Sequence, residues 1–151
     1  YNGDWITGVI EGLGTAHYVN GLIYKGQFLD GMSHGKGTMT YENGNVYTGD
    51  WNTGLKSGAG IATYTNGTVY TGDFRDGRRH GIGTILMGNG FEYTGQWLQG
   101  EIEGDGTAKY ENNDIYIGAF VKGKRHGKGK MFYFKGQIME GEWKNGRPTS
   151  N

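Results

Sequence analysis

The chain has 151 residues with 32 glycines, one proline and no cysteine, and its 15 basic and 15 acidic side chains cancel. This length suits one ordinary domain, the balanced charge argues against nucleic-acid binding by the whole chain, and the absence of cysteine excludes disulfides and thiolate metal sites. The aromatic content of 14% argues against a flexible glycine-rich linker, because disordered chains are poor in large apolar side chains.

One pattern of residues recurs every 23 positions along the chain. Each repeat begins Tyr-x-Gly-x-Trp or Phe, runs through a polar loop to Gly-x-Gly, and ends with Tyr and x-Asn-Gly. A fixed period of this length is typical of repeat architectures. We therefore expect one array over residues 1–151, with repeats at 1–23, 24–46, 47–69, 70–92, 93–115, 116–138 and a partial repeat at 139–151.

Each repeat predicts two β-strands. The runs between the glycines are rich in Thr, Tyr, Val and Ile and are too short for helices. Asn-Gly pairs such as Asn20-Gly21 favour hairpin turns between repeats. The expected fold is all-β: an elongated, twisted single antiparallel sheet of stacked β-hairpins, with about thirteen strands.

The alternation of side chains along a strand predicts what each face carries. With a within-repeat loop at residues 6–11 and a three-residue turn at residues 19–21, Trp5 lies opposite Gly12 and Gly3 opposite Gly14. One face then carries a row of glycines between aromatic rings, which lean over the bare backbone. The other face carries threonines and charged residues and is expected to be solvated.

Successive repeats alternate between two kinds. Repeats with Trp at the fifth position carry Ala at the sixteenth, whereas repeats with Phe at the fifth carry Met or Ile there. A large ring next to a small side chain is what close packing on one surface requires. The packing unit is therefore expected to be a pair of repeats, 46 residues long.

The spacing Tyr-x-Gly-x-Trp/Phe…Gly-x-Gly at a period of 23 resembles the MORN repeat (membrane occupation and recognition nexus). In the third repeat the matching residues are Tyr47, Gly49, Trp51, Gly54, Gly58, Gly60 and Gly67. The resemblance covers the whole chain and implies an elongated, twisted antiparallel sheet of stacked hairpins. It also implies a scaffolding role at cytoskeletal or membrane-associated structures, often with self-association. Some members carry an enzyme domain elsewhere in the chain, and phospholipid binding has been proposed for the family.

No residues predict catalysis, and we expect no enzyme activity, cofactor or metal. Segments 31–37 and 123–129 resemble a phosphate-binding loop, but each is one residue too short and lacks Ser or Thr after the Lys. His34, His80 and His126 share one position of the repeat. A step of four strands spans about 19 Å, too far for a shared metal. We expect these histidines at hairpin tips, hydrogen-bonded to loops.

A single sheet must cover its apolar face. The sheet can curl over its own rings, receive a peptide or helix in a groove, or pair with a second copy, and the sequence leaves these three solutions open. An exposed row of Tyr and Trp has the composition of a binding hot spot and predicts contact with a protein, for instance a cytoskeletal one. The predicted groove residues are Tyr24, Phe28, Tyr47, Trp51, Tyr70, Phe74, Tyr93, Trp97, Tyr116 and Phe120.

The charge distribution predicts a homodimer through the C-terminal repeats. Residues 1–115 hold seven basic and thirteen acidic side chains, whereas residues 116–151 hold eight basic and two acidic ones. A two-fold pairing would set the acidic fifth repeat of one copy against the basic sixth of the other. Extra rings near the end support an interface, or alternatively cap the last hairpin and protect an edge strand. The predicted self-association residues are Phe132, Phe134, Met139, Trp143, Glu101, Glu103, Lys124 and Arg125.

Basic hairpin tips provide the alternative function, a peripheral module on anionic phospholipid. The candidate headgroup contacts are Arg78, Arg79, Lys124 and Arg125, each contributing about 1 kcal/mol near an anionic surface. Acidic tips oppose this binding, so we rank a protein partner above lipid. We expect a cytoplasmic location at the cytoskeleton or a membrane. The chain begins on a repeat boundary and ends inside a repeat, as a fragment of a longer array or of a larger enzyme would.

Overall fold

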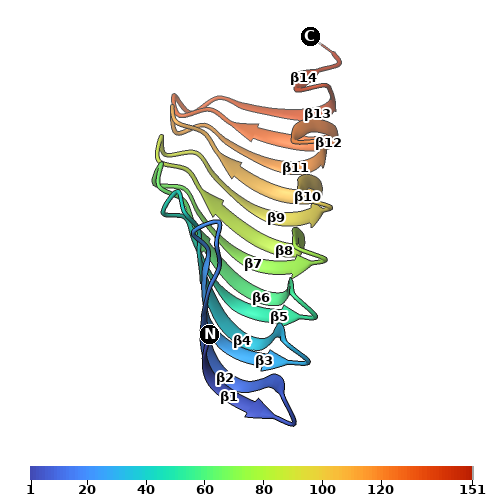
Figure 1. Ribbon diagram of the computed structural model, residues 1–151. Coiled ribbons are helices and arrows are strands. Elements are labelled where there is room, and N and C mark those ends of the chain that lie inside the picture. The colour runs from blue at the N-terminus through green and yellow to red at the C-terminus, as the bar shows by residue number, and fades with distance from the viewer. Residues whose placement is uncertain (151) are drawn as a thin grey trace. The chain divides into compact units, whose positions relative to one another are not determined.

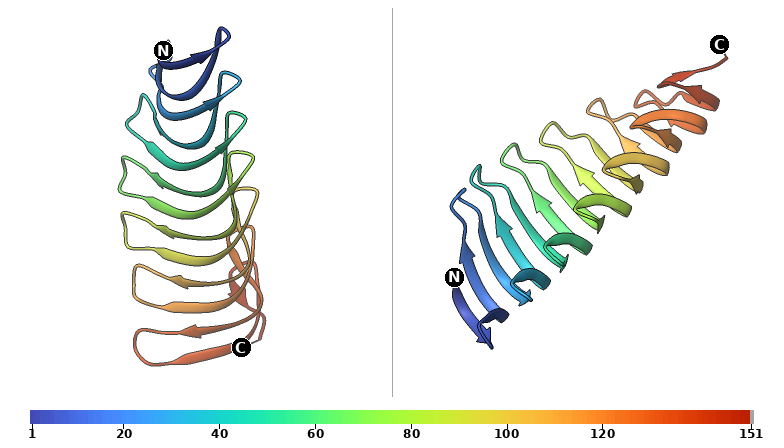
Figure 2. Two further views of the ribbon diagram at one scale, coloured as in Figure 1. Left: turned by 90° about the horizontal axis from the view of Figure 1, so that it is seen from below. Right: turned by 45° about the vertical axis from the view of Figure 1, so that its right-hand side comes forward.

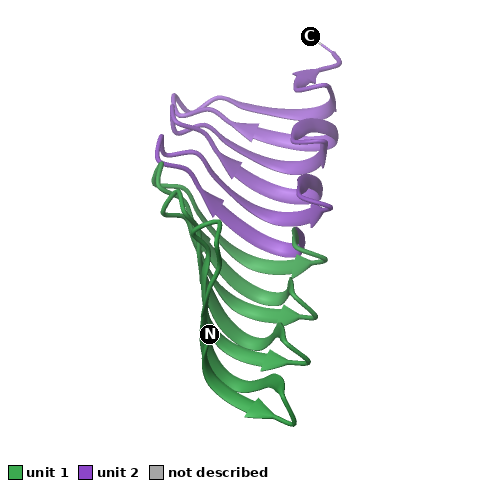
Figure 3. Ribbon diagram, in the orientation of Figure 1, with its two compact units in different colours: residues 1–78 green, residues 79–151 purple. Residues whose placement is uncertain are grey.

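The computed structural model describes residues 1–150, which contain strands and turns but no helix (Figure 1). The strands pair in chain order in a 14-stranded antiparallel sheet. The predicted all-β fold with a single antiparallel sheet is thus confirmed. The chain divides into two compact units, residues 1–78 and 79–151 (Figure 3). The expectation of one domain over residues 1–151 stays a prediction.

Two strands come from each repeat. Unit 1 holds β1 (Asn2–Ile6), β2 (Val9–His17), β3 (Ile23–Leu29), β4 (Met32–Thr40), β5 (Val46–Asn52), β6 (Leu55–Thr63) and β7 (Val69–Arg75). Apart from its first residue, β8 (Arg78–Leu86) lies in unit 2, which also holds β9 (Glu92–Leu98), β10 (Glu101–Lys109), β11 (Ile115–Val121), β12 (Lys124–Phe132), β13 (Ile138–Lys144) and β14 (Arg147–Pro148). The two-residue β14 is the strand beyond the predicted thirteen.

The hairpin inside each repeat closes with a two-residue turn, not with the longer loop predicted at residues 6–11. Thr7 and Gly8 both have positive φ, 49° and 83°, as a type I′ turn requires. In consequence Trp5 pairs with Ile10 and not, as predicted, with Gly12. A bulge between Gly3 and Trp5 then restores the predicted register of Gly3.

The turns between repeats match the prediction. The backbone N–H of Tyr18 donates to the carbonyl of Leu22 at 2.8 Å, which closes a three-residue loop. Gly21 ends that loop with a φ of 81°, as a glycine in the left-handed region does in such turns. Gly14 pairs with Gly26 across it, as expected. Within each unit the two kinds of turn lie at opposite ends of the strands (Figure 2).

The glycine row is bare because a tyrosine lies over it. In β3 the Tyr24 side chain is fully buried, and its hydroxyl donates to the carbonyl of Gln27 at 2.8 Å. A Cβ atom on Gly37, in the paired strand β4, would overlap the Tyr24 ring. The same arrangement recurs with Tyr47 over Gly60, Tyr93 over Gly106 and Tyr116 over Gly129. The prediction that rings lean over the glycine row is confirmed.

The rings also form a ladder of edge-to-face pairs. The Tyr24 ring contacts Phe28 in its own repeat, with centroids 5.0 Å apart, and Trp51 in the next repeat at 5.3 Å. In unit 2, Tyr93 contacts Trp97 and Phe120 in the same way, at 5.5 and 5.2 Å. Each such pair contributes about 0.5–1.5 kcal/mol beyond its buried area. We call the face with these rings the inner face, and the opposite one the outer face.

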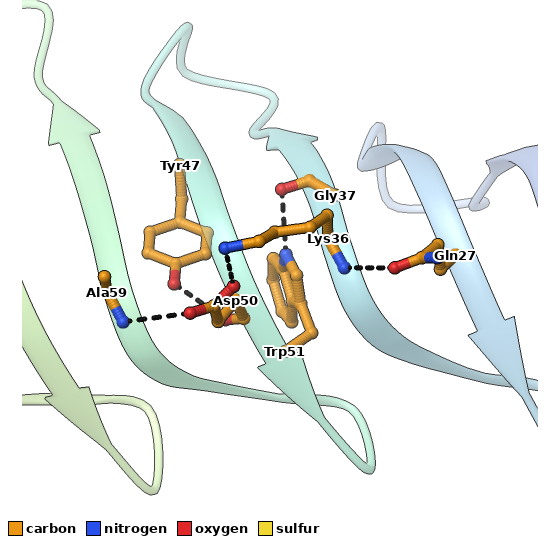
Figure 4. A network of polar contacts seen from close by, with 7 residues as sticks. All are labelled: Gln27, Lys36, Gly37, Tyr47, Asp50, Trp51 and Ala59. Atoms are coloured by element: carbon orange, nitrogen blue, oxygen red, sulfur yellow. Dashed lines mark hydrogen bonds and ion pairs between the residues drawn. The ribbon is translucent and has the colours of Figure 1, made fainter.

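On the outer face, a polar network holds the bulge of hairpins whose fourth repeat position is Asp or Gln (Figure 4). The carboxylate of Asp50 accepts a 3.2 Å hydrogen bond from the backbone N–H of Ala59 and forms an ion pair with Lys36. In the preceding hairpin, Gln27 Oε1 accepts the Lys36 N–H at 2.7 Å. The fourth position of the repeat therefore supplies a hydrogen bond that the bulge would otherwise remove from the ladder.

Candidate functional site: an aromatic groove in unit 2

In three repeats the tenth position places a basic side chain, Lys56, Arg79 or Arg125, over the inner-face rings. In unit 1 the Lys56 Nζ lies 5.1 Å from the ring centroids of Tyr41 and Tyr47 and 5.8 Å from that of Phe74. In unit 2 the Arg79 guanidinium lies 5.4 Å from the Trp97 ring. These distances are typical of cation–π interactions. Sequence reasoning missed this role because position ten fell inside the predicted loop.

Arg125 makes three contacts of this kind in unit 2. Its guanidinium lies 4.8 Å from the Trp143 ring, 5.3 Å from Tyr110 and 6.0 Å from Tyr116. It also donates from Nη2 to the carbonyl of Gly146 at 2.6 Å. A planar guanidinium stacks on aromatic faces and keeps its remaining N–H groups in a fixed fork. Arg125 is therefore a positioned donor with a known orientation.

Around Arg125 the inner face of unit 2 is hollowed into a groove of about 820 Å³. Its walls come from the strand ends and from the turns that follow them. Tyr110, Tyr133 and Phe91 belong to these turns, while Trp143 belongs to β13. We call this site the aromatic groove; its lining includes Met87, Phe91, Tyr110, Arg125, Tyr133 and Trp143.

The lining of the aromatic groove combines apolar rings with charged side chains. Burial raises the pKa of the Tyr110 hydroxyl, and the Arg125 guanidinium opposes part of that rise. Glu111 and Asp114 line one side and Arg147 also contributes to the lining. Glu111 accepts a 2.6 Å hydrogen bond from the Asn89 amide. A concave site that combines apolar and aromatic side chains with a few oriented polar groups is the usual form of a ligand or peptide site.

The ten predicted groove residues do not form an exposed row. All are buried: the five tyrosines have 0% relative exposure, and the Trp and Phe residues have 3 to 5%. This corrects the expectation of exposure. The physical reason is that the rings pack against one another and the tyrosine hydroxyls bind the backbone, so the sheet covers its own apolar face. Direct contact of these ten residues with a partner stays a prediction.

The predicted self-association residues are spread over both faces. Trp143 is buried at 3% exposure and Arg125 lies over it, so both belong to the inner face. Phe134 is 72% exposed. Glu101 and Lys124 are exposed, and Phe132 and Met139 are half-buried. Glu103 accepts the backbone N–H of Lys122 at 2.8 Å. The structure thus places Arg125 against Trp143, and self-association stays a prediction.

The four candidate lipid contacts also differ in placement. Arg78 and Lys124 are exposed, whereas Arg79 and Arg125 are half-buried over aromatic rings. Adjacent side chains of a strand point to opposite faces. In each pair, therefore, one basic group is presented to solvent on the outer face and the other is held on the inner face.

Two of the histidines at the shared position, His34 and His126, hydrogen-bond to turns as predicted, but they lie in strands β4 and β12 and not at the hairpin tips. The Nδ1 of His34 accepts the backbone N–H of Thr53, and the Nδ1 of His126 accepts that of Asn145, both at 3.5 Å. Glu11 plays the same part for the N–H of Asp30 at 3.2 Å. Position eleven thus joins one repeat to the turn of the next through a carboxylate at Glu11 and Glu103 and through a histidine at His34 and His126.

The sequence matches the model of the MORN repeat at residues 1–23, 24–46, 47–69, 70–91, 93–115, 116–138 and 140–149. No curated protein matches the chain. Within residues 1–150 no helix is long and apolar enough to cross a membrane.

Solved structures with a similar fold include the TCP domain of SAS-4 (dCPAP) from Drosophila melanogaster, in complex with a proline-rich motif of Ana2 (dSTIL). It is 21% identical over 83% of this chain and 70% of that chain, with a TM-score of 0.51. A virginiamycin B lyase from Staphylococcus aureus is 8% identical over 88% of this chain and 56% of that chain, with a TM-score of 0.24, too low to bear on fold or activity.

Proposed function

The chain belongs to the MORN repeat family, and from this premise we propose that it is a non-enzymatic scaffold that holds an extended, proline-rich protein segment in the aromatic groove of unit 2. MORN repeats indicate a module for interaction with proteins or membranes, and proteins of this family are generally not enzymes. Cytoskeletal or membrane-associated structures are the proposed setting.

The observation that carries this proposal is the placement of Arg125 beside Tyr110 and Trp143 in a groove of about 820 Å³. Proline-rich segments adopt the polyproline II helix before binding, so little conformational entropy is lost when they dock on aromatic walls. Their carbonyl groups lack internal hydrogen bonds and would accept the free N–H groups of a fixed guanidinium. The similar SAS-4 domain, solved with a proline-rich motif, provides a precedent in the same fold.

Fluorescence polarisation of a labelled polyproline peptide tests this function. We expect binding to the full chain, and about tenfold weaker binding to Tyr110→Ala. Tyr41→Ala is the matched control, because Tyr41 occupies the same repeat position in unit 1, under Lys56. Equal affinities of the two variants, or no binding by the unmodified chain, would contradict the proposal.

A lipid function remains the second candidate, supported by the exposed Arg78 and Lys124. Sedimentation with phosphatidylserine vesicles at low salt tests it, since attraction to anionic lipid weakens with ionic strength. A lipid function would be favoured over a protein partner if the unmodified chain binds no peptide and if both it and Tyr110→Ala bind the vesicles. Self-association through the C-terminal repeats is the remaining part of the proposed function.

A further inference from the structure

The outer face of β11 is apolar along its whole length. Its outward residues are Ile115, Ile117, Ala119 and Val121, of which Ile117 is 49% and Val121 39% exposed. The other long strands of unit 2 mix polar or charged residues into this face; in β13 the outward residues after Ile138 are Glu140, Glu142 and Lys144. A strand that is apolar on both faces is usually covered by a second layer of structure on each face.

Ala119 shows that this surface is not required by the fold. At the same repeat position Gln96 Oε1 accepts the Asp105 N–H at 2.7 Å, and Asp50 accepts the Ala59 N–H at 3.2 Å. A methyl group cannot accept a hydrogen bond. The hairpin of β11 and β12 therefore lacks this side-chain bond and presents apolar surface to the outside instead.

Opposite charges flank the apolar strand on the outer face. On one side, β10 carries Glu101 and Asp105; on the other, β12 carries Lys124 and Lys128. Glu101 and Lys124 stand 23 residues apart, as do Asp105 and Lys128. Each pair occupies equivalent heights in β10 and β12, because Gly106 and Gly129, also 23 residues apart, both pair with Gly118 of β11. Lys130, further along β12, is already paired with Glu140 at 3.3 Å.

We propose that the outer face of β10, β11 and β12 is a two-fold interface between two copies of this chain. With the two-fold axis parallel to β11, β11 packs on β11 and the acidic β10 of each copy faces the basic β12 of the other, in register. An in-plane axis across the strands would instead place β10 on β10, acid against acid. Sheets that pack face to face lie about 10 Å apart, within reach of opposed Glu and Lys side chains.

This interface deepens the self-association part of the proposed function and is independent of the aromatic groove. It excludes Arg125 and Trp143, which face inward, and keeps Glu101 and Lys124 from the sequence-based set. The apolar centre with a charged rim is the usual composition of a specific interface, and the surface is isologous, as a two-fold dimer requires.

Charge reversal with sedimentation equilibrium of the full chain tests the proposal. The unmodified chain is expected to have twice the 16.6 kDa chain mass at micromolar concentration. An acid-reversed variant (E101K/D105K) and a base-reversed variant (K124E/K128E) should each self-associate about 100-fold more weakly, because like charges then face each other. An equimolar mixture of the two should form a heterodimer, and the variant with all four changes should dimerise again.

Ile117→Asp should abolish the dimer, whereas Thr71→Asp, at the same repeat position in unit 1, should leave it intact. Circular dichroism and the peptide assay above confirm that each variant is folded and keeps its groove. A monomeric unmodified chain would overturn the proposal. Unchanged dimerisation in either reversed variant, or no heterodimer in the mixture of folded variants, would also overturn it.

Discussion

The indole Nε1 of Trp51 donates a 3.0 Å hydrogen bond to the carbonyl oxygen of Gly37, one repeat earlier in the chain. Trp97 bonds to Gly83 at 3.0 Å and Trp143 to Gly129 at 3.3 Å in the same way. Phenylalanine at this position cannot make the bond. The alternation of Trp and Phe therefore means that this link occurs at every second repeat.

Trp51→Phe should destabilise the protein by about 2 kcal/mol, because the buried Gly37 carbonyl loses its donor and a small void forms. Urea unfolding followed by far-ultraviolet circular dichroism measures this change without depending on tryptophan emission. Trp5→Phe is the control: Trp5 has the same repeat position but is 57% exposed, and we expect less than about 0.5 kcal/mol. An equal loss of stability in Trp51→Phe and Trp5→Phe would show that the hydrogen bond from the indole is not the cause of the destabilisation.

Gly37→Ala should cost about 3 kcal/mol, because the added methyl overlaps the Tyr24 ring, which the Gln27 carbonyl holds in place. The backbone conformation is not at issue, since Gly37 does not have a positive φ. Thermal unfolding compares this variant with Thr38→Ala, one residue along on the outer face, for which about 1 kcal/mol or less is expected. A tolerated Gly37→Ala would mean that the Tyr24 ring can move aside.

The stability of the fold should decline at alkaline pH. Burial raises the pKa of Tyr24 and of Tyr93 from 10.0 to about 12. The unfolded chain then ionises near pH 10 while the folded chain does not, so these tyrosines stabilise the fold fully below pH 10. That contribution is lost as the pH rises from about 10 to about 12. Urea titrations at a series of pH values, with tyrosinate absorbance in parallel, check the window; a pH-independent midpoint would contradict it.

Ala119→Gln should stabilise the monomer by about 1 kcal/mol, because the new amide oxygen can accept the backbone N–H of Lys128. The reverse change, Gln96→Ala, removes the 2.7 Å bond to Asp105 and should destabilise by a similar amount. Chemical denaturation of dilute protein measures both. With the dimer interface on the outer face of β11, Ala119→Gln also weakens the dimer. The same substitution then stabilises the monomer and destabilises the dimer.

The sequence was sufficient to predict the paired glycines, because a period of 23 residues and the alternation of a strand leave few registers for Gly14 and Gly26. It was not sufficient to predict that the side chains of Lys56 and Arg125 lie on the inner face. Their face depends on the length of the turn before them, and the two-residue turn with its bulge brings position ten inward, whereas a six-residue loop would leave it in solvent. The Thr-Gly and Asp-Gly pairs that form these turns lie inside the longer predicted loop, and the bulge has no signal in residue types alone.

The exposure of the aromatic row was also predicted incorrectly, for a different reason. Counting residues on a face shows which side chains share it, but not whether they cover one another. Tyr47 is buried because it contacts Trp51 and Phe74 edge to face while its hydroxyl binds the Asp50 carbonyl. The groove that does open is lined by turn residues such as Tyr110 and Tyr133, which recur at position eighteen of the repeat and lie outside the predicted aromatic row.

The edge-to-face ladder has a spectroscopic consequence. Rings held about 5 Å apart couple their electronic transitions, so the protein should show strong near-ultraviolet circular dichroism and efficient energy transfer from tyrosine to tryptophan. Trp51 in unit 1 and Trp143 in unit 2 each contact a buried tyrosine, at 5.1 and 5.4 Å. Single-tryptophan variants would therefore make the emission of one indole a local optical probe, able to tell whether the third and the last repeats unfold together or in succession.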